Sequence, residues 1–292
     1  MSTVEISPAR RLWWSVRREL WENRSVYLAP LAVAALFLVG FSIALVRLPE
    51  RMRAASALAP MQRQEAIEQP YVIVAIMLMA IALLVAVFYS LDALYGERRD
   101  RSILFWKSLP VSDLTTVLSK ASIPILVLPL VTFAVTVATQ FLMLLTSSAV
   151  LAASGISVAT LWTHVPFFEV SGIHLSHIVG FHGIWWAPLY GWFLMVSAWA
   201  KRAPFLWATL PPVAIGAVER IAFDTSRFAR LLEDHFLGGP ISGGSGGGMT
   251  MDMLAGDPWG RFLLDSGLWI GMAVTAVFLL AAVRLRRSRG PI

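Results

Sequence analysis

The sequence predicts an all-α integral membrane protein with six transmembrane helices, preceded by an N-terminal amphipathic helix that lies in the membrane interface. Of its 292 residues, 57% are hydrophobic and only 14% are charged, and the mean hydropathy is +0.69. These values are typical of membrane proteins. Six apolar stretches approach the ~20 residues that a helix needs to cross a hydrocarbon core ~30 Å thick.

The first 27 residues are predicted to form a cytoplasmic tail and the interfacial helix. At helical spacing, four apolar residues share one side of this helix: Leu12, Trp13, Val16 and Leu20. Arginines flank them, and Trp14 and Trp21 belong at the boundary between lipid and water. The helix either anchors the chain only or also touches a cytoplasmic partner. No cleavable signal peptide is expected, because the first apolar stretch is long enough to stay in the membrane.

The transmembrane domain is predicted to cover residues 28–292. Its six spans are expected at about residues 28–48, 71–94, 121–145, 178–200, 203–218 and 262–283. The fifth is short and contains Pro211 and Pro212, which should break or kink a helix. Lipid tolerates such a break only where neighbouring groups satisfy the carbonyls that it frees.

The distribution of basic residues predicts that both termini are cytoplasmic. The N-terminus, the loop 95–120, Lys201-Arg202 and the C-terminus hold most of the 24 lysines and arginines, whereas residues 149–177 hold none. Basic loops at an anionic membrane surface also explain the net charge of +6, so no nucleic-acid partner is implied. The absence of cysteine excludes disulfides, thiolate catalysis and cysteine-based metal sites.

The loop from residue 95 to 120 contains the sequence GERRDRSILFWKSLPVSD. Gly96 can end the preceding helix, Pro110 interrupts any helix through 103–109, and Ser112 is a plausible N-cap for the next one. The one or two helical turns between them expose Phe105, Trp106 and Leu109 among charged residues. Such an aromatic group ringed by charges suits a docking site. The alternative is an ordinary basic loop whose tryptophan lies in the interface.

Two stretches resemble the membrane subunit of bacterial ABC transporters of the ABC-2 type. They are YGERRDRSILFWKSLPVSD in the first cytoplasmic loop and WWAPLYGWFLMVSAWAKRAPFLWATLPP at residues 185–212. The resemblance implies a type V exporter-like permease in the bacterial inner membrane that pairs with a second copy or a paralogue. It also implies an interfacial elbow helix, and a coupling helix that seats in a groove of a separate ATPase, present in two copies.

By that resemblance, the ATPase docks on the loop 97–110, and Lys201-Arg202 forms a smaller second contact. The implied coupling residues are Glu97, Arg98, Arg99, Arg101, Phe105, Trp106, Leu109 and Pro110. ATP and Mg would be bound by the partner, and no cofactor by this chain.

The chain is expected not to be an enzyme. It contains no GxxxxGK[ST] motif, and the Gly-rich stretch 238–248 has no lysine to reach a phosphate. Ionisable residues in the spans are confined to their ends, which does not favour ion-coupled transport. An external ATPase fits both absences. Permeases of this kind often carry re-entrant helices before the sixth span, where this chain has GGPISGGSGGGM, and the structure of that segment stays open.

Two other site types were weighed. Ser245 lies in a GxSG sequence like that of six-span rhomboid proteases, but it falls in a glycine-rich loop, and the sixth span has no histidine to act as a base. Four histidines gather around the third outward loop: His164, His174, His177 and His182. They either hold a metal or are structural, and without a tight ligand motif the structural interpretation is preferred.

A polar stripe crosses the third span. It consists of Thr132, Thr136, Thr139 and Gln140, whose spacing places them on one helix face. Such a face either makes interhelical hydrogen bonds or lines a translocation path in the centre of a dimer. The sequence does not name the transported solute.

Overall fold

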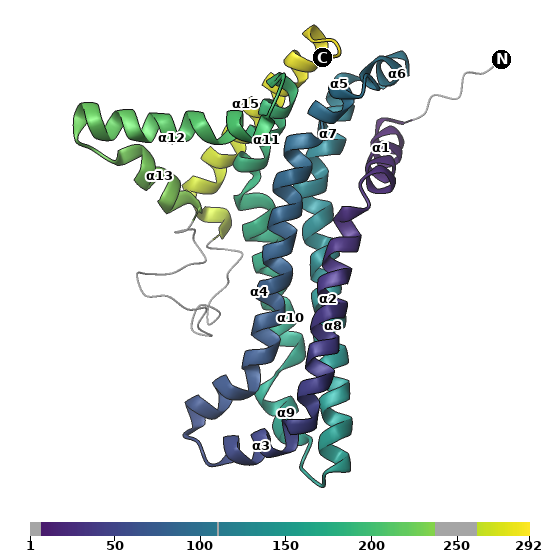
Figure 1. Ribbon diagram of the computed structural model, residues 1–292, viewed down its shortest axis with the longest axis vertical. Coiled ribbons are helices and arrows are strands. Elements are labelled where there is room, and N and C mark those ends of the chain that lie inside the picture. The colour runs from purple at the N-terminus through teal and green to yellow at the C-terminus, as the bar shows by residue number, and fades with distance from the viewer. Residues whose placement is uncertain (1–6, 110, 237–261) are drawn as a thin grey trace, which may run out of the picture. The chain divides into compact units, whose positions relative to one another are not determined.

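The structure, a computed structural model, describes residues 7–109, 111–236 and 262–292, and every regular element in these ranges is a helix (Figure 1). The predicted all-α class is therefore confirmed. The chain divides into two compact units. Unit 1 combines residues 1–24, 86–128 and 179–292, and unit 2 combines residues 25–85 and 129–178.

Unit 2 is built mainly from long apolar helices. Its elements are α2 (Ser25–Ala44), a short 3-10 turn, α3 (Leu48–Ser56), the first part of α4 (Pro60–Asp92), α8 (Leu128–Ala153), α9 (Ala159–His164) and α10 (Phe167–Leu175). Val74 and Leu78 of α4 meet Met143, Leu144 and Leu151 of α8 in a fully buried core. These residues are apolar, and between helices in a membrane such side chains stabilise the structure through close packing.

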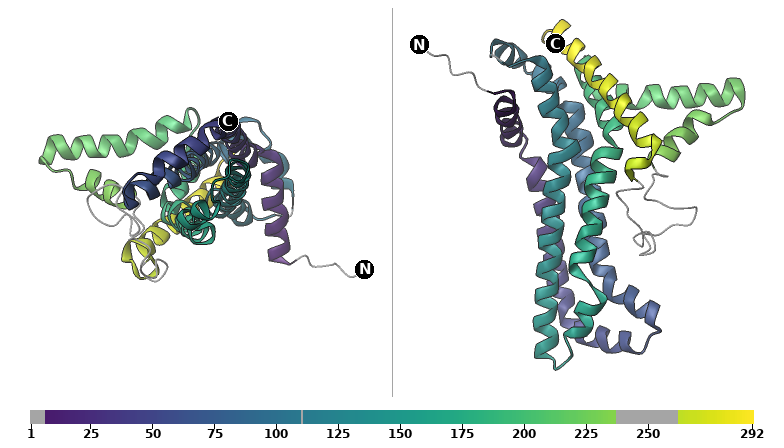
Figure 2. Two further views of the ribbon diagram at one scale, coloured as in Figure 1. Left: turned by 90° about the horizontal axis from the view of Figure 1, so that it is seen from below. Right: turned by 180° about the vertical axis from the view of Figure 1, so that it is seen from behind.

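Unit 1 contains the N-terminal helix, the short helices of the loop 95–120 and most of the C-terminal half of the chain. Its elements are α1 (Pro8–Glu22), α5 (Tyr95–Arg99), α6 (Ile103–Ser108), α7 (Asp113–Ser122), the π-helices η2 (Ile123–Val127) and η3 (Ser176–Trp185), α11 (Ala187–Trp199), α12 (Pro204–Phe223), α13 (Arg227–Phe236) and α15 (Ser266–Ser288). α7 packs against α1 and α15, and α11 packs against α15, the yellow helix of Figure 2. Gly191 permits the last approach, because a Cβ there would lie only 3.4 Å from side-chain atoms of Thr275 and Phe278.

Among the described residues, five helices are long and apolar enough to cross a membrane. They cover Ser25–Ser56, Pro60–Arg99, Asp113–Ala153, Pro204–Phe223 and Ser266–Ser288. The fourth predicted span, 178–200, corresponds instead to η3 followed by α11, with Trp186 between them. Neither element alone reaches the required length, because the helical hydrogen-bond pattern changes there from π to α. Six spans therefore stay a prediction.

The break that we expected at Pro211 and Pro212 is absent, because α12 runs through both. Proline has no N–H, so Pro212 leaves the carbonyl of Ala208 without its usual helical donor. The indole Nε1 of Trp192, on α11, donates a hydrogen bond of 3.0 Å to that carbonyl. A side chain of the neighbouring helix thus replaces the missing backbone donor, as a helix in lipid requires.

Candidate functional site

The loop 95–120 has local structure of its own. α4 ends at Asp92, before Gly96, which lies inside α5. Arg101, with φ of 60°, reverses the chain between α5 and α6. The predicted N-cap is confirmed, because the Ser112 side chain accepts a hydrogen bond of 3.1 Å from the backbone N–H of Thr115. The loop therefore holds two short helices that could not form alone in water and depend on contacts with the rest of unit 1.

Those contacts centre on a buried ionic cluster that joins four helices. We define it by its six charged members: Arg18 and Glu19 of α1, Glu97 of α5, Asp113 and Lys120 of α7, and Arg286 of α15. Three are carboxylates and three are cations, so the cluster as a whole is neutral. Tyr89 adds a neutral donor, because its hydroxyl lies 3.0 Å from Oε2 of Glu19.

At the centre, Lys120 lies between two carboxylates. Its Nζ is 3.0 Å from Oε1 of Glu19 and 3.1 Å from Oε1 of Glu97. Nη2 of Arg286 lies 3.2 Å from the other oxygen of Glu97. These four side chains are between 0% and 8% exposed. Burial of a charge is costly unless it is paired, so each member depends on the presence of its partners.

Two further ion pairs lie at the edge of the cluster. Arg286 also binds Asp113, and Nη2 of Arg18 lies 2.7 Å from Oε1 of Glu19. Burial by itself would raise the pKa of Glu19, but the positive charges of Lys120 and Arg18 outweigh it and hold that pKa below its ordinary value. Glu19 therefore stays ionised at neutral pH inside the unit.

Arg98 also binds the same loop to the end of α11. Its Nη1 donates hydrogen bonds of 2.8 and 3.0 Å to the carbonyls of Ala198 and Ala200, at the end of α11. The backbone N–H of Ile292 in turn donates to the carbonyl of Arg98 at 3.2 Å. Glu97 and Arg98 are consecutive and both buried, so α5 is held from two sides.

Beyond this base, α6 presents an exposed apolar tip, which we define as Leu104, Phe105 and Leu109. Leu104 and Phe105 are each 59% exposed. Trp106 is half-buried, because the guanidinium carbon of Arg18 lies 3.9 Å from its ring centre. The Phe105 ring meets the Trp106 ring edge to face at 4.9 Å between centroids. Trp106 thus packs against both Phe105 and Arg18, and so links the apolar tip to the ionic cluster.

The predicted coupling residues therefore separate into two groups. Glu97 and Arg98 face inward and bind other parts of this chain, whereas Arg99, Arg101, Phe105 and Leu109 are exposed. Pro110 lies outside the described residues. Sequence reasoning missed the inward partners, above all Glu19. The available signal was Lys120 alone, an isolated charge at the start of an apolar stretch, because Glu19 lies among other charged residues of its own helix.

The predicted polar stripe of the third span is buried within unit 2. Thr132, Thr136, Thr139 and Gln140 are at most 3% exposed. The hydroxyls of Thr136 and Thr139 donate to carbonyls of their own helix, and Nε2 of Gln140 donates to the Tyr71 carbonyl on α4 at 3.0 Å. Gln140 thus makes an interhelical hydrogen bond, the first of the two alternatives. A translocation path along this face stays a prediction.

Among the described residues, the remaining candidate residues give no metal site. Within the described ranges, no three His, Cys, Asp or Glu side chains gather closely enough to hold a metal ion. Nδ1 of His164 lies 2.7 Å from the Thr160 carbonyl, a local structural contact. Ser245 and the glycine-rich stretch 238–248 lie outside the described residues.

Comparison with protein-family models, with curated proteins and with solved structures finds no match for this chain. The functional argument therefore depends on the residues and on the geometry described above.

Proposed function

We propose that this protein is the membrane-spanning permease subunit of an ABC transporter, an exporter of the ABC-2 type in the bacterial inner membrane. A separate ATPase would dock on the loop 97–110 and supply the energy, with two permease subunits and two ATPase subunits in the working unit. The observation that carries the proposal is an exposed apolar tip mounted on a buried ionic cluster, in a loop predicted to be cytoplasmic.

The arrangement suits a contact that must withstand force. A docking site needs apolar side chains that a partner can bury, and Leu104, Phe105 and Leu109 supply them. The loop that carries these side chains must also be held firmly in place, and the ionic cluster links it to α1, α7 and α15. A loop that served only to connect two spans would need neither feature.

The geometry also refines which side chain should act as the anchor. Phe105 is 59% exposed, whereas one face of Trp106 already lies against Arg18. We therefore expect Phe105 to enter the groove of the ATPase and Trp106 to orient it. Arg99 and Arg101 are exposed beside the tip and would contribute charge complementarity at the rim, which affects the rate and specificity of docking more than its affinity.

The test uses the transporter purified from its native membrane with its ATPase attached. Because this chain has no nucleotide-binding motif, ATP hydrolysis in the preparation reports the partner. Phe105→Ala should weaken docking by ~2 kcal/mol or more, roughly thirtyfold in affinity, as truncation of a buried aromatic anchor commonly does. ATPase activity per permease should fall accordingly, while the amount of inserted permease stays the same.

Leu118→Ala is the matched control, because Leu118 is also apolar and 41% exposed but lies on α7, away from the tip. Trp106→Ala should fall between Phe105→Ala and this control if its main role is to orient Phe105. Equal ATPase activity in Phe105→Ala, Leu118→Ala and the parent chain would show that the loop is an ordinary basic connector.

A further inference from the structure

Unit 2 contains a half-open cavity of about 900 Å³ that the proposed function does not use. Its walls come from α2, α3 and the start of α4, with single contributions from α8 and α9. Apart from Arg51, Gln69, Tyr71 and Ser147, every side chain that lines it is apolar. A volume near the upper end of the ~300–1,000 Å³ typical of ligand sites, with few polar groups, suits a small amphiphilic molecule.

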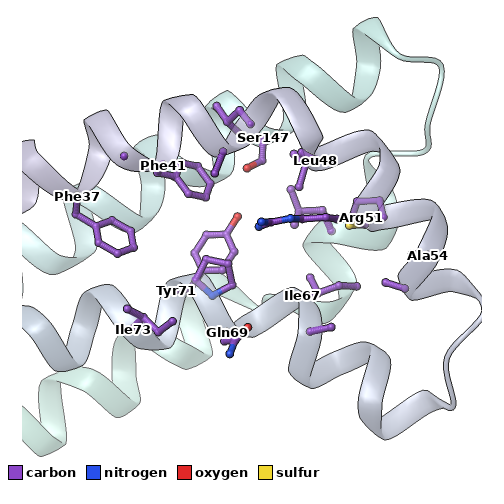
Figure 3. A pocket seen from close by; sticks show the side chains of 18 of the residues that line it. Phe37, Phe41, Leu48, Arg51, Ala54, Ile67, Gln69, Tyr71, Ile73 and Ser147 are labelled. Carbon is purple, nitrogen blue, oxygen red and sulfur yellow. The ribbon is translucent and has the colours of Figure 1, made fainter.

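The polar groups of the cavity gather near Arg51. Figure 3 shows the Arg51 guanidinium and the hydroxyls of Tyr71 and Ser147 turned toward one another, with Phe41 beside them and Phe37 and Ile73 farther away. Ser147 is only 1% exposed, and its hydroxyl faces that of Tyr71. Each hydroxyl can donate one hydrogen bond and accept two, so both keep capacity for a ligand oxygen.

Two nearby arginines differ in what they bind. Arg63 is engaged, because its guanidinium donates to the carbonyls of Ala55, Ser56 and Leu58 at 3.3, 2.8 and 3.2 Å and thereby holds the end of α3. Arg51 makes no ion pair with any acidic side chain in the described part of the chain. Its five donors are thus available to an anion from outside the protein.

Arg51 and the two phenylalanines of the cavity lie at different depths along the spans, as the headgroup and the alkyl chain of a lipid do. Arg51 follows the first predicted span, and Tyr71 begins the second, so the polar groups belong near the level at which both helices leave the hydrocarbon. Phe37 and Phe41 lie further back along α2, toward the middle of the first span, whereas Ile73 follows Tyr71 by two residues at the start of the second.

We propose that this cavity binds an anionic amphiphile, with its carboxylate or phosphate on Arg51 and Ser147 and its alkyl chain among Phe37, Phe41 and Ile73. The two ends of the ligand then serve different purposes. The alkyl chain leaves other lipid tails and not water, so it gains little transfer free energy and mainly positions the ligand, whereas the charge-assisted hydrogen bonds from Arg51 select the anion. The proposal does not depend on an ATPase.

The experiment is photo-cross-linking of the full chain, without ATPase, in nanodiscs of zwitterionic phosphatidylcholine. Three probes carry the same diazirine-labelled oleoyl chain: the free fatty acid, lysophosphatidylglycerol and the uncharged monoacylglycerol. Cross-linked peptides are identified by mass spectrometry. We expect the anionic probes to label residues 36–45 and 66–77, and the uncharged probe to label them at least tenfold less. Labelling by the fatty acid alone or by the lysolipid alone identifies the source of the anion, and either supports the proposal.

Two pairs of variants test the two ends of the site. Arg51→Gln should reduce labelling by the anionic probes about tenfold, whereas Arg53→Gln, on the same helix but outside the cavity, should not. Gly40→Leu should abolish labelling by filling the cavity, since a Cβ at Gly40 meets no atom within 4 Å. Gly216→Leu is its control, because Gly216 also has open space around its Cβ position but lies on α12.

Several results would overturn the proposal. Equal labelling by the uncharged probe, or equal effects of Arg51→Gln and Arg53→Gln, would show that no anion is selected. Unchanged labelling in Gly40→Leu would place the probe elsewhere. Cross-links from a diazirine at residue 40 to a second copy of the chain, in place of lipid probe, would show that the cavity is covered by protein. If Gly40→Leu fails to insert, the two arginine variants still decide the question.

Discussion

Lys120 offers the strongest test of the ionic cluster, because its ammonium group is shared by two buried carboxylates. Replacement of Lys120 by methionine keeps much of the side-chain volume and removes the charge. Glu19 and Glu97 then lose contacts of 3.0 and 3.1 Å while they are only 0% and 8% exposed. Removal of one partner from a buried ion pair typically costs about 3–5 kcal/mol, since the other charge stays desolvated.

That cost is measurable by thermal unfolding of the purified protein in detergent. For a chain of this size, about 3–5 kcal/mol corresponds to a fall in Tm of roughly 6–20 °C. Arg99→Met is the matched control, because it removes a cation from the same loop that is 53% exposed and pairs with Asp92 and Asp100 only at the surface. Solvent screens such pairs, so its Tm should stay close to that of the parent chain.

A double variant separates the pairing from other effects of the substitution. Glu19→Gln combined with Lys120→Met removes both charges of one pair, so the combined loss of stability should be smaller than the sum of the two single losses. The reasoning would be refuted if Lys120→Met lowered Tm no more than Arg99→Met, since water would then reach the cluster. Strict additivity in the double variant would refute it as well.

Three further outcomes are expected. Because the pKa of Glu19 is held below its ordinary value of 4.5, the stability that its ionised form contributes should be complete above that pH and lost as the pH falls through the lower, folded-state value. Comparison of Tm against pH for the parent chain and Glu19→Gln measures this, and a difference that changes above pH 4.5 would contradict it. Trp192→Phe removes the donor to the Ala208 carbonyl and should lower the free energy of unfolding by ~1–3 kcal/mol. The loss should be smaller in a Pro212→Ala background, where a backbone N–H is again present, and equal losses in both backgrounds would contradict this role of Trp192. In intact cells, a cysteine at Ser154 should react with an impermeant thiol reagent while one at Ser112 is protected, and the reverse pattern would invert the predicted topology.

Sequence reasoning succeeded where structure depends on short-range chemistry. The long apolar helices follow from hydropathy alone, and the Ser112 N-cap follows from a hydroxyl placed to accept the backbone N–H of Thr115. At Pro211 and Pro212 the sequence predicted a break or a kink, with the freed carbonyls satisfied by a neighbouring helix; no break occurs, and a neighbouring helix does supply a donor. The identity of that donor was not predictable, because Trp192 lies 16 positions before Ala208 and no local pattern reveals that its indole meets the Ala208 carbonyl.

The candidate site was likewise predictable from the sequence only in part. A basic loop with an aromatic tip was visible in the sequence, and the structure places Phe105 at the surface. The inward direction of Glu97 and Arg98 was not visible, because it depends on partners far away in the chain. Arg286 is separated from Glu97 by 189 positions, and hydropathy scales count such a residue only as a charge near the end of a span.

The location of the cluster bears on how a docked ATPase could act on this chain. α5 and α6 are too short to hold their shape alone, so Phe105 can move relative to the rest of unit 1 only if the contacts of Glu97 and Lys120 break. Such a break would leave buried charges unpaired at about 3–5 kcal/mol for each pair. Movement of the tip together with α1, α7 and α15 leaves every pair intact and has no such cost. If an ATPase docks at this tip as proposed, force applied at Phe105 would shift these helices as one body, and weakening the cluster would separate ATP hydrolysis from transport.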